Sequence, residues 1–169
     1  MRTERKRLLA DGLIAGFIGY GVVVASFLAW NVAAGLPPFH TAALMGAALF
    51  GGLRDPALLV IEPGMVIAFN GVHLAAFLGF GFVAAWLVYE TEQHPQFWYL
   101  AFFLFLVMAV AGFAVVLATS LVVGSLLPPW EVVLASMASA IGMATYLVGS
   151  HRGLVRLIRT APERLGTVD

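Results

Sequence analysis

The stretch GLIAGFIGYGVVVASFLAWNVAA, residues 12–34, contains no Asp, Glu, Lys or Arg. About 20 mostly apolar residues are enough for a helix to cross the ~30 Å hydrocarbon core of a membrane. Three further stretches meet the same criterion, at residues 64–89, 96–126 and 130–149. We therefore expect an all-α integral membrane protein with four spanning helices in a single domain, residues 1–169.

The composition leads to the same class of protein. The chain is 62% hydrophobic and 11% charged, whereas a soluble domain is about 25% charged. The expected partner is therefore the lipid bilayer, with bound lipid. Nucleic acid is not expected, because no basic groove with interleaved aromatic residues is present. The absence of cysteine excludes disulfides and thiolate metal sites.

The positions of the basic residues predict the orientation. Arg54 is the only Lys or Arg between residues 8 and 151, and the other eight lie at the two ends of the chain. Basic flanks stay on the cytoplasmic side of a membrane, so the termini, residues 1–11 and 150–169, are expected to be cytoplasmic. Two cytoplasmic termini require an even number of spans. The arginines of the last segment also predict a basic amphipathic helix on the inner membrane surface.

The segment 36–62 is expected on the outer side. Its uncharged part, residues 39–53, is only about 15 residues long, which is short for a span. An interfacial helix and a re-entrant helix both remain open for it. Asp55 precedes Pro56 and is expected to cap a helix start.

The ends of the expected spans carry tryptophan and proline. The tryptophan positions fit two interfacial aromatic belts, with Trp30 and Trp130 on the outer side and Trp86 and Trp98 on the inner side. Pro63, Pro95 and Pro129 lie where the later spans begin, and the first turn of a helix tolerates proline. Because the connections between spans are short, we expect an antiparallel four-helix bundle.

Small residues predict where helices meet. Apolar burial cannot drive helix association in lipid, so close packing through small side chains does so instead. The contacts could lie within the bundle, with a partner subunit or in a homo-oligomer. The candidate helix-packing positions are Gly12, Gly16, Gly71, Ala75, Gly79, Ser136 and Ala140.

Polar residues inside a membrane are costly, so they are candidates for function. His73 lies in the second expected span, about 13 Å from its outer end, and Asn70 is on the same helical face three residues earlier. Residues expected at similar depth in the other spans are 20–24, Met108, Ser139 and Met143.

Three roles are open for His73. It could be an axial ligand of haem b, which needs a second ligand from across the bundle. Together with Asn70, it could bind a quinone carbonyl or relay a proton. A neutral histidine bonded to a neighbouring group would instead stabilise the bundle. His151 is expected to be an interfacial anchor. No metal site is expected at Glu90, Glu92 and His94, because one histidine and one carboxylate on a face do not form a specific site.

No catalytic motif such as GxSxG, HExxH or a phosphate-binding loop is present, so no catalytic residue is assigned. The leading hypothesis is a non-catalytic accessory or structural subunit of a larger membrane complex, for example a respiratory or photosynthetic electron-transfer assembly. One alternative is a haem- or quinone-binding redox subunit that uses His73 and Asn70. Another is a small transporter or channel.

The order of these features resembles a known group of proteins. A first span is followed by LPPFHTAALMGAALFGGLRDP, residues 36–56, and by a second span with histidine in VHLAAF, residues 72–77. This pattern is similar to that of a group of small four-span bacterial membrane proteins. The resemblance implies a bacterial inner membrane and no particular activity.

Overall fold

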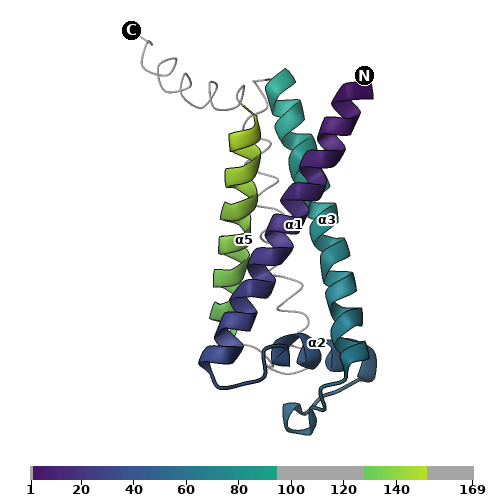
Figure 1. The fold of residues 1–169 in the computed structure, drawn as a ribbon, viewed down its shortest axis with the longest axis vertical. Helices are drawn as coiled ribbons and strands as arrows, with labels where there is room; N and C mark the ends of the chain where they lie inside the picture. Colours follow the sequence, from purple (N-terminus) through teal and green to yellow (C-terminus); the bar gives the residue numbers. More distant parts are fainter. Residues whose placement is uncertain (1, 95–127, 152–169) are drawn as a thin grey trace.

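The structure, a computed structural model, describes residues 2–94 and 128–151. The described elements are all helical: α1 (Arg2–Ala33), α2 (His40–Gly51), the short 3-10 helix η1 (Pro56–Leu58), α3 (Pro63–Gln93) and α5 (Pro129–Ser150) (Figure 1). The expected span 96–126, with Trp98 and Met108, and the expected C-terminal amphipathic helix lie outside the described residues.

Three of the described helices are long and apolar enough to cross a membrane, and they cover three of the four expected spans. They are residues Arg5–Ala33 of α1, the whole of α3 and the whole of α5. α3 and α5 begin at Pro63 and Pro129. Proline is tolerated in the first turn of a helix, because the N–H groups there have no hydrogen-bond partner within the helix. Both α1 and α3 continue past the apolar stretches into charged sequence, so these helices are longer than the expected spans.

The long helices lie side by side (Figure 1). α1 and α3 are antiparallel, and α5 runs in the direction of α3 along the other side of α1. α1 packs extensively against both, whereas α3 and α5 barely touch each other. α2 lies across one end of the bundle, which we call the α2 end. The start of α1 and the ends of α3 and α5 lie together at the opposite end, which we call the far end.

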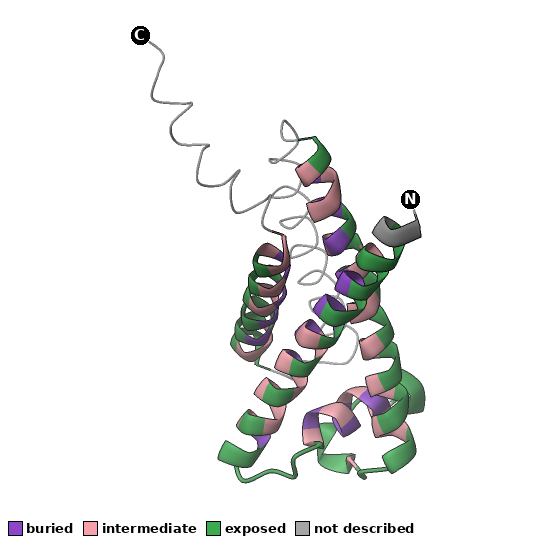
Figure 2. Cartoon of the chain, turned by 45° about the horizontal axis from the view of Figure 1, so that its top comes forward, coloured by how far each residue is buried: buried purple, intermediate pink, exposed green. Residues whose placement is uncertain are grey.

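The distribution of polar and apolar side chains is the reverse of that in a soluble protein. Polar Asp11, Asn31 and Ser139 are buried, whereas the outward faces of α1 and α3 between residues 9 and 29 and between residues 67 and 86 carry only apolar side chains and glycine. Figure 2 shows the exposed residues along the outer sides of the helices. Such a surface is suited to lipid as the surrounding solvent.

Glycines bring α1 and α3 into backbone contact. A Cβ added at Gly16 would lie 2.8 Å from Leu78 Cα and from the Phe77 carbonyl oxygen, and a Cβ at Gly81 would meet the backbone at Gly12 and Gly16. Side chains at these positions would hold the two helices apart. The glycines therefore permit the close approach that favours packing in lipid.

α1 and α5 are joined at mid-length and at the α2 end. At mid-length the Ser139 hydroxyl donates to the Gly19 carbonyl oxygen over 3.1 Å, next to buried Met143. At the α2 end the rings of Trp30 and Trp130 meet edge to face, with centroids 5.5 Å apart. These two contacts fix the register of α5 on α1.

α2 is held in place from both neighbouring helices. Asn31, near the end of α1, donates from Nδ2 to the Pro38 carbonyl oxygen over 2.9 Å and accepts at Oδ1 from the Thr41 hydroxyl, also over 2.9 Å. On its other side, α2 approaches α3 where Gly46 lies against the backbone of Met65. α2 ends at Gly51 and is capped by Gly52, whose φ of 68° is the left-handed conformation that glycine tolerates.

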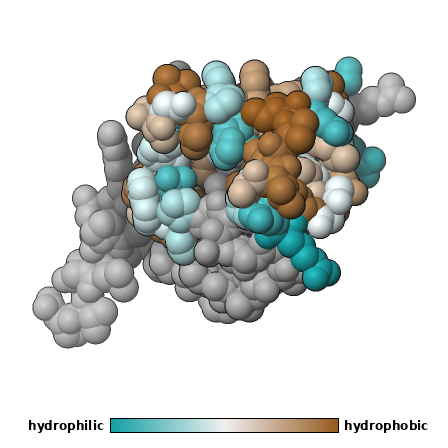
Figure 3. Space-filling model, turned by 90° about the horizontal axis from the view of Figure 1, so that it is seen from below, coloured by the Kyte–Doolittle hydropathy of each residue, from teal (hydrophilic) through white to brown (hydrophobic). Residues whose placement is uncertain are grey.

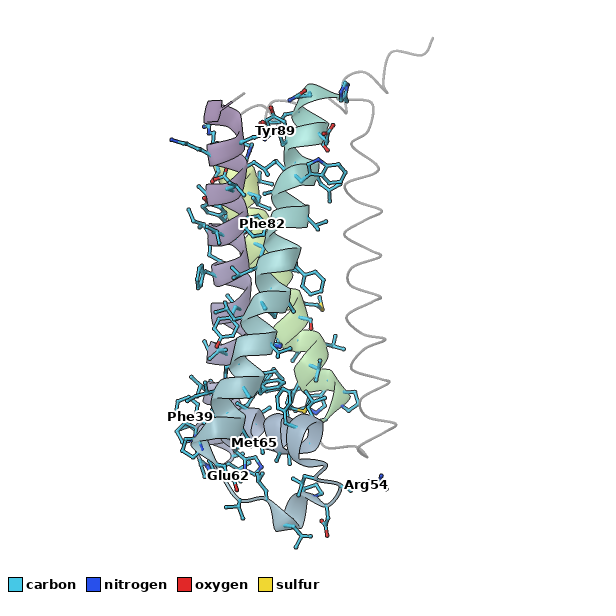
Figure 4. All side chains as sticks on the ribbon, turned by 90° about the vertical axis from the view of Figure 1, so that its right-hand side faces the viewer. Phe39, Arg54, Glu62, Met65, Phe82 and Tyr89 are labelled. Carbon is cyan, nitrogen blue, oxygen red and sulfur yellow. The ribbon has the colours of Figure 1, made fainter. Side chains whose placement is uncertain are left out.

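The loop beyond α2 mixes apolar and charged side chains, as the view onto this end shows (Figure 3). Leu58 and Val60 are each 70% exposed. The Asp55 side chain accepts a hydrogen bond of 3.0 Å from the Ala57 backbone N–H at the start of η1. This contact confirms the expected helix cap. Arg54 points away from Glu62 (Figure 4).

Candidate functional site

The mid-bundle polar residues form a hydrogen-bonded bridge between α1 and α3. The Tyr20 hydroxyl donates to Oδ1 of Asn70 over 2.8 Å. The Asn70 Nδ2 group in turn donates to the Val66 carbonyl oxygen, also over 2.8 Å. Asn70 therefore uses its amide to hold Tyr20 in place, and it has one remaining N–H for any other partner.

His73 lies beside this bridge in an aromatic setting. Its ring stacks on Phe69, with centroids 5.3 Å apart and planes inclined by 21°. Phe77 meets the ring at an angle of 64° and a centroid distance of 5.0 Å, and Tyr20 lies 6.1 Å away. Sequence reasoning placed residues 20–24 at this depth, and the Tyr20 contacts agree with it.

The nitrogens of His73 differ from the other polar groups at this level. The side chain is half-buried, yet neither ring nitrogen has a hydrogen-bond partner among residues 2–94 and 128–151. An imidazole nitrogen can donate to or accept from a ligand, or bind a metal ion. The described residues hold no cluster of three or more His, Cys, Asp or Glu side chains that could share a metal with it.

A second polar cluster lies at the far end, between α1 and α5. The Tyr146 hydroxyl donates to Oδ1 of Asp11 over 2.9 Å. Nε2 of His151 lies 3.8 Å from Oδ2 of the same carboxyl group, and Nδ1 of His151 contacts the Leu147 carbonyl oxygen at 3.0 Å. We call Asp11, Tyr146 and His151 the far-end cluster.

Sequence reasoning missed Asp11 as a site residue. It sits at the boundary between the charged flank and the apolar stretch, so it is easily read as part of the flank. His151 was expected as an interfacial anchor, and the structure adds Asp11 and Tyr146 beside it. The sequence contains one indication of this cluster: Asp11, Tyr146 and His151 each lie at or near the far-end limit of an apolar stretch.

The two ends of the bundle are separated by a membrane thickness. At 1.5 Å per residue, Asp11 and Trp30 lie about 28 Å apart along α1. Trp130 and His151 lie about 31 Å apart along α5 by the same measure. Both lengths match the ~30 Å hydrocarbon core, so the tryptophan pair and the far-end cluster are spaced like the two interfaces of a bilayer.

The expected helix-packing positions fall into two groups. Gly12 and Gly16 lie in the α1–α3 contact described above. Gly71 and Gly79 have no described residue within 4 Å of a Cβ position, and Ala75 between them is exposed. The role of this second stripe in packing stays a prediction.

On α5 the buried stripe is Ala135, Ser139, Met143 and Leu147. It lies beside the expected positions, because Ser136 is exposed and Ala140 is half-buried. A role for these two residues in packing also stays a prediction. Of the expected anchors at the far end, Trp86 is 49% exposed.

No protein-family model matches this chain, and comparisons with curated proteins and with solved structures give no significant match.

Proposed function

We propose that the chain is a four-span protein of a bacterial inner membrane with both termini in the cytoplasm. Two observations support a fourth span. The end of α3 and the start of α5 lie at opposite ends of the bundle (Figure 1), so the chain between them has to return along its length. The uncharged stretch 96–126 is long enough to do so in lipid.

Within that membrane, the proposed function is a non-catalytic subunit that binds another membrane protein. The observation that carries this proposal is the exposed face of α3. Its middle consists of small residues, Ala68, Gly71, Ala75, Ala76 and Gly79, broken only by Val72. Small residues are the typical contact positions between helices in lipid.

The outward face of α1 makes a useful contrast. Toward the far end it carries Leu13, Ile14 and Phe17, which are 40%, 43% and 53% exposed, whereas its exposed residues farther along, Gly21, Ala25 and Ala29, are small. Bulky side chains fill the space next to mobile lipid tails, whereas the small face of α3 leaves room for a backbone to approach. Inside the chain the same arrangement is already used where Gly12 and Gly16 meet α3.

The test is purification in mild detergent after cross-linking in native membranes. We expect a partner membrane protein to co-purify with the parent chain and to be lost in Gly71→Leu and Gly79→Leu variants. Gly21→Leu is the matched control, because Gly21 is exposed on α1 with no described residue near its Cβ position. A chain that always migrates alone would overturn the proposal, and a partner retained by both α3 variants would remove this face from it.

His73 supports a second candidate, the binding of a haem b or a quinone by a redox subunit. The specific observation is that its ring is held by Phe69 and Phe77 while its nitrogens have no described partner. An imidazole at mid-depth in a membrane is costly unless its nitrogens have a hydrogen-bond partner or a ligand. The imidazole would donate to a quinone carbonyl or provide one axial ligand for haem.

The absorption spectrum and the extracted quinone content of the purified protein test this candidate. A Soret band, or bound quinone, that disappears in His73→Ala would support it. His40→Ala is the control, because His40 lies in α2 away from the mid-bundle bridge. The candidate would be overturned if the parent protein, purified from native membranes, contained neither pigment nor quinone.

A further inference from the structure

The far-end cluster has an arrangement that responds to a proton. Nδ1 of His151 faces the Leu147 carbonyl oxygen at 3.0 Å. A carbonyl oxygen only accepts hydrogen bonds, so Nδ1 carries the proton in the neutral ring. Nε2, which points at Oδ2 of Asp11 from 3.8 Å, is then an unprotonated nitrogen facing a carboxyl oxygen.

Adding a proton at Nε2 changes that contact. The ring becomes an imidazolium whose second N–H is directed at Asp11, which already accepts from Tyr146. The side chains of His151 and Asp11 are only 10% and 13% exposed. Water therefore screens their attraction less than at an open surface.

We propose that Asp11, Tyr146 and His151 form a proton-controlled clamp that holds the far ends of α1 and α5 together. α5 is otherwise fixed to α1 by Ser139 at mid-length and by Trp130 at the α2 end. When the imidazolium is present, the clamp adds an ion pair to the Tyr146 hydrogen bond. When the ring is neutral, only that hydrogen bond remains, and the far ends separate more readily.

The direction of the pH effect follows from the charge that is gained. The ion pair exists only with the protonated ring, so it is favoured as pH falls and weakened as pH rises. Several other titratable and charged groups lie near this end within the described ranges 2–94 and 128–151. Arg7 is exposed one turn before Asp11, and α3 contributes Tyr89 and Glu90, which are half-buried. Neither Tyr89 nor Glu90 has a hydrogen bond or ion pair to the cluster within the described residues.

The distance between spin labels on the two helices tests the clamp directly. The chain has no native cysteine, so the pair Leu9→Cys and Gly149→Cys labels the far ends without background. We expect a short, narrow distance distribution in acidic buffer and loss of its short-distance population in alkaline buffer. The pair Ala29→Cys and Val133→Cys reports the α2 end, where no change with pH is expected.

Variants separate the clamp from a general effect of pH. His151→Asn keeps a donor for the Leu147 carbonyl oxygen and removes the titrating nitrogen, and Asp11→Asn removes the charge but keeps an acceptor for Tyr146. Both should abolish the pH dependence, whereas Tyr146→Phe should retain it. A far-end distance in the parent protein that is independent of pH would overturn the proposal. It would also be overturned if His151→Asn kept the dependence, or if the α2-end pair changed equally. The parent protein with its α2-end control decides the question even if a variant fails to fold.

Discussion

The hydroxyl of Tyr146 donates to Oδ1 of Asp11 over 2.9 Å although the two residues are 135 positions apart in the chain. This bond joins the start of α1 to the end of α5. Tyr146→Phe removes the donor and leaves a buried acceptor, so we expect the free energy of unfolding to fall by about 1–3 kcal/mol. A denaturing-detergent titration followed by tryptophan fluorescence measures it.

Thr145→Val is the control for that change. The Thr145 hydroxyl is exposed and donates to the Ile141 carbonyl oxygen of its own helix, so its loss should have little effect on the contact between α1 and α5. Equal destabilisation by the two variants would show that the bond to Asp11 contributes nothing specific.

The glycine contact between α1 and α3 should not tolerate even one methyl group. Gly81→Ala places a Cβ against the backbone at Gly12 and Gly16, so the helices must separate, at a cost of about 1–3 kcal/mol. The same titration should show no destabilisation for Gly79→Ala, where nothing described lies near the Cβ, because alanine is favoured over glycine in a helix interior by about 0.5–1 kcal/mol. If Gly81→Ala were as stable as Gly79→Ala, the close packing described for this crossing would be incorrect.

The Tyr20–Asn70 bridge should give a measurable coupling energy. In a double-mutant cycle of Tyr20→Phe and Asn70→Leu, we expect the two changes to be non-additive by about 0.6 kcal/mol, and by no more than about 1.7 kcal/mol. Strict additivity would mean that the two side chains do not interact. The absorption spectrum of each variant also shows whether the bridge positions His73 for a ligand.

Thr41 should control how firmly α2 is attached. Its hydroxyl donates to Oδ1 of Asn31 in a buried contact, so Thr41→Val removes the bond with little change in shape. Hydrogen exchange across His40–Gly51 should become faster in this variant, while exchange in α5 stays the same. Unchanged protection of α2 would assign its stability to the contact between Gly46 and Met65 alone.

The long helices were predictable because lipid imposes a length and a composition on them. The apolar stretches 12–34, 64–89 and 130–149 lie within or nearly within α1, α3 and α5, and Pro63 and Pro129 mark two of the starts correctly. At the far end the helices extend beyond these apolar stretches, by ten residues at the start of α1 and by fewer elsewhere. Hydropathy registers only the part in lipid, whereas backbone hydrogen bonding continues the helix through Arg5 and Lys6.

Pairing between helices was harder to predict. The depth of His73 and Tyr20 followed from residue counting, but the hydrogen bond from Tyr20 to Asn70 depends on the rotation of each helix about its axis. When a helix is largely apolar and has small residues on several faces, its sequence indicates only weakly which face turns toward its neighbour. The same limit explains why Gly81 and the bond between Asp11 and Tyr146 were not anticipated.

The proposed topology places the bundle across a membrane, with the far end in the cytoplasm and the α2 end outside. Single cysteines at Lys6, Leu58 and Gln93 test it in spheroplasts with a membrane-impermeant maleimide, since the chain has no other thiol. The account predicts that Leu58→Cys is labelled in intact cells, whereas Lys6→Cys and Gln93→Cys are labelled only after permeabilisation. Labelling of Lys6→Cys or Gln93→Cys in intact spheroplasts, with Leu58→Cys protected, would contradict it.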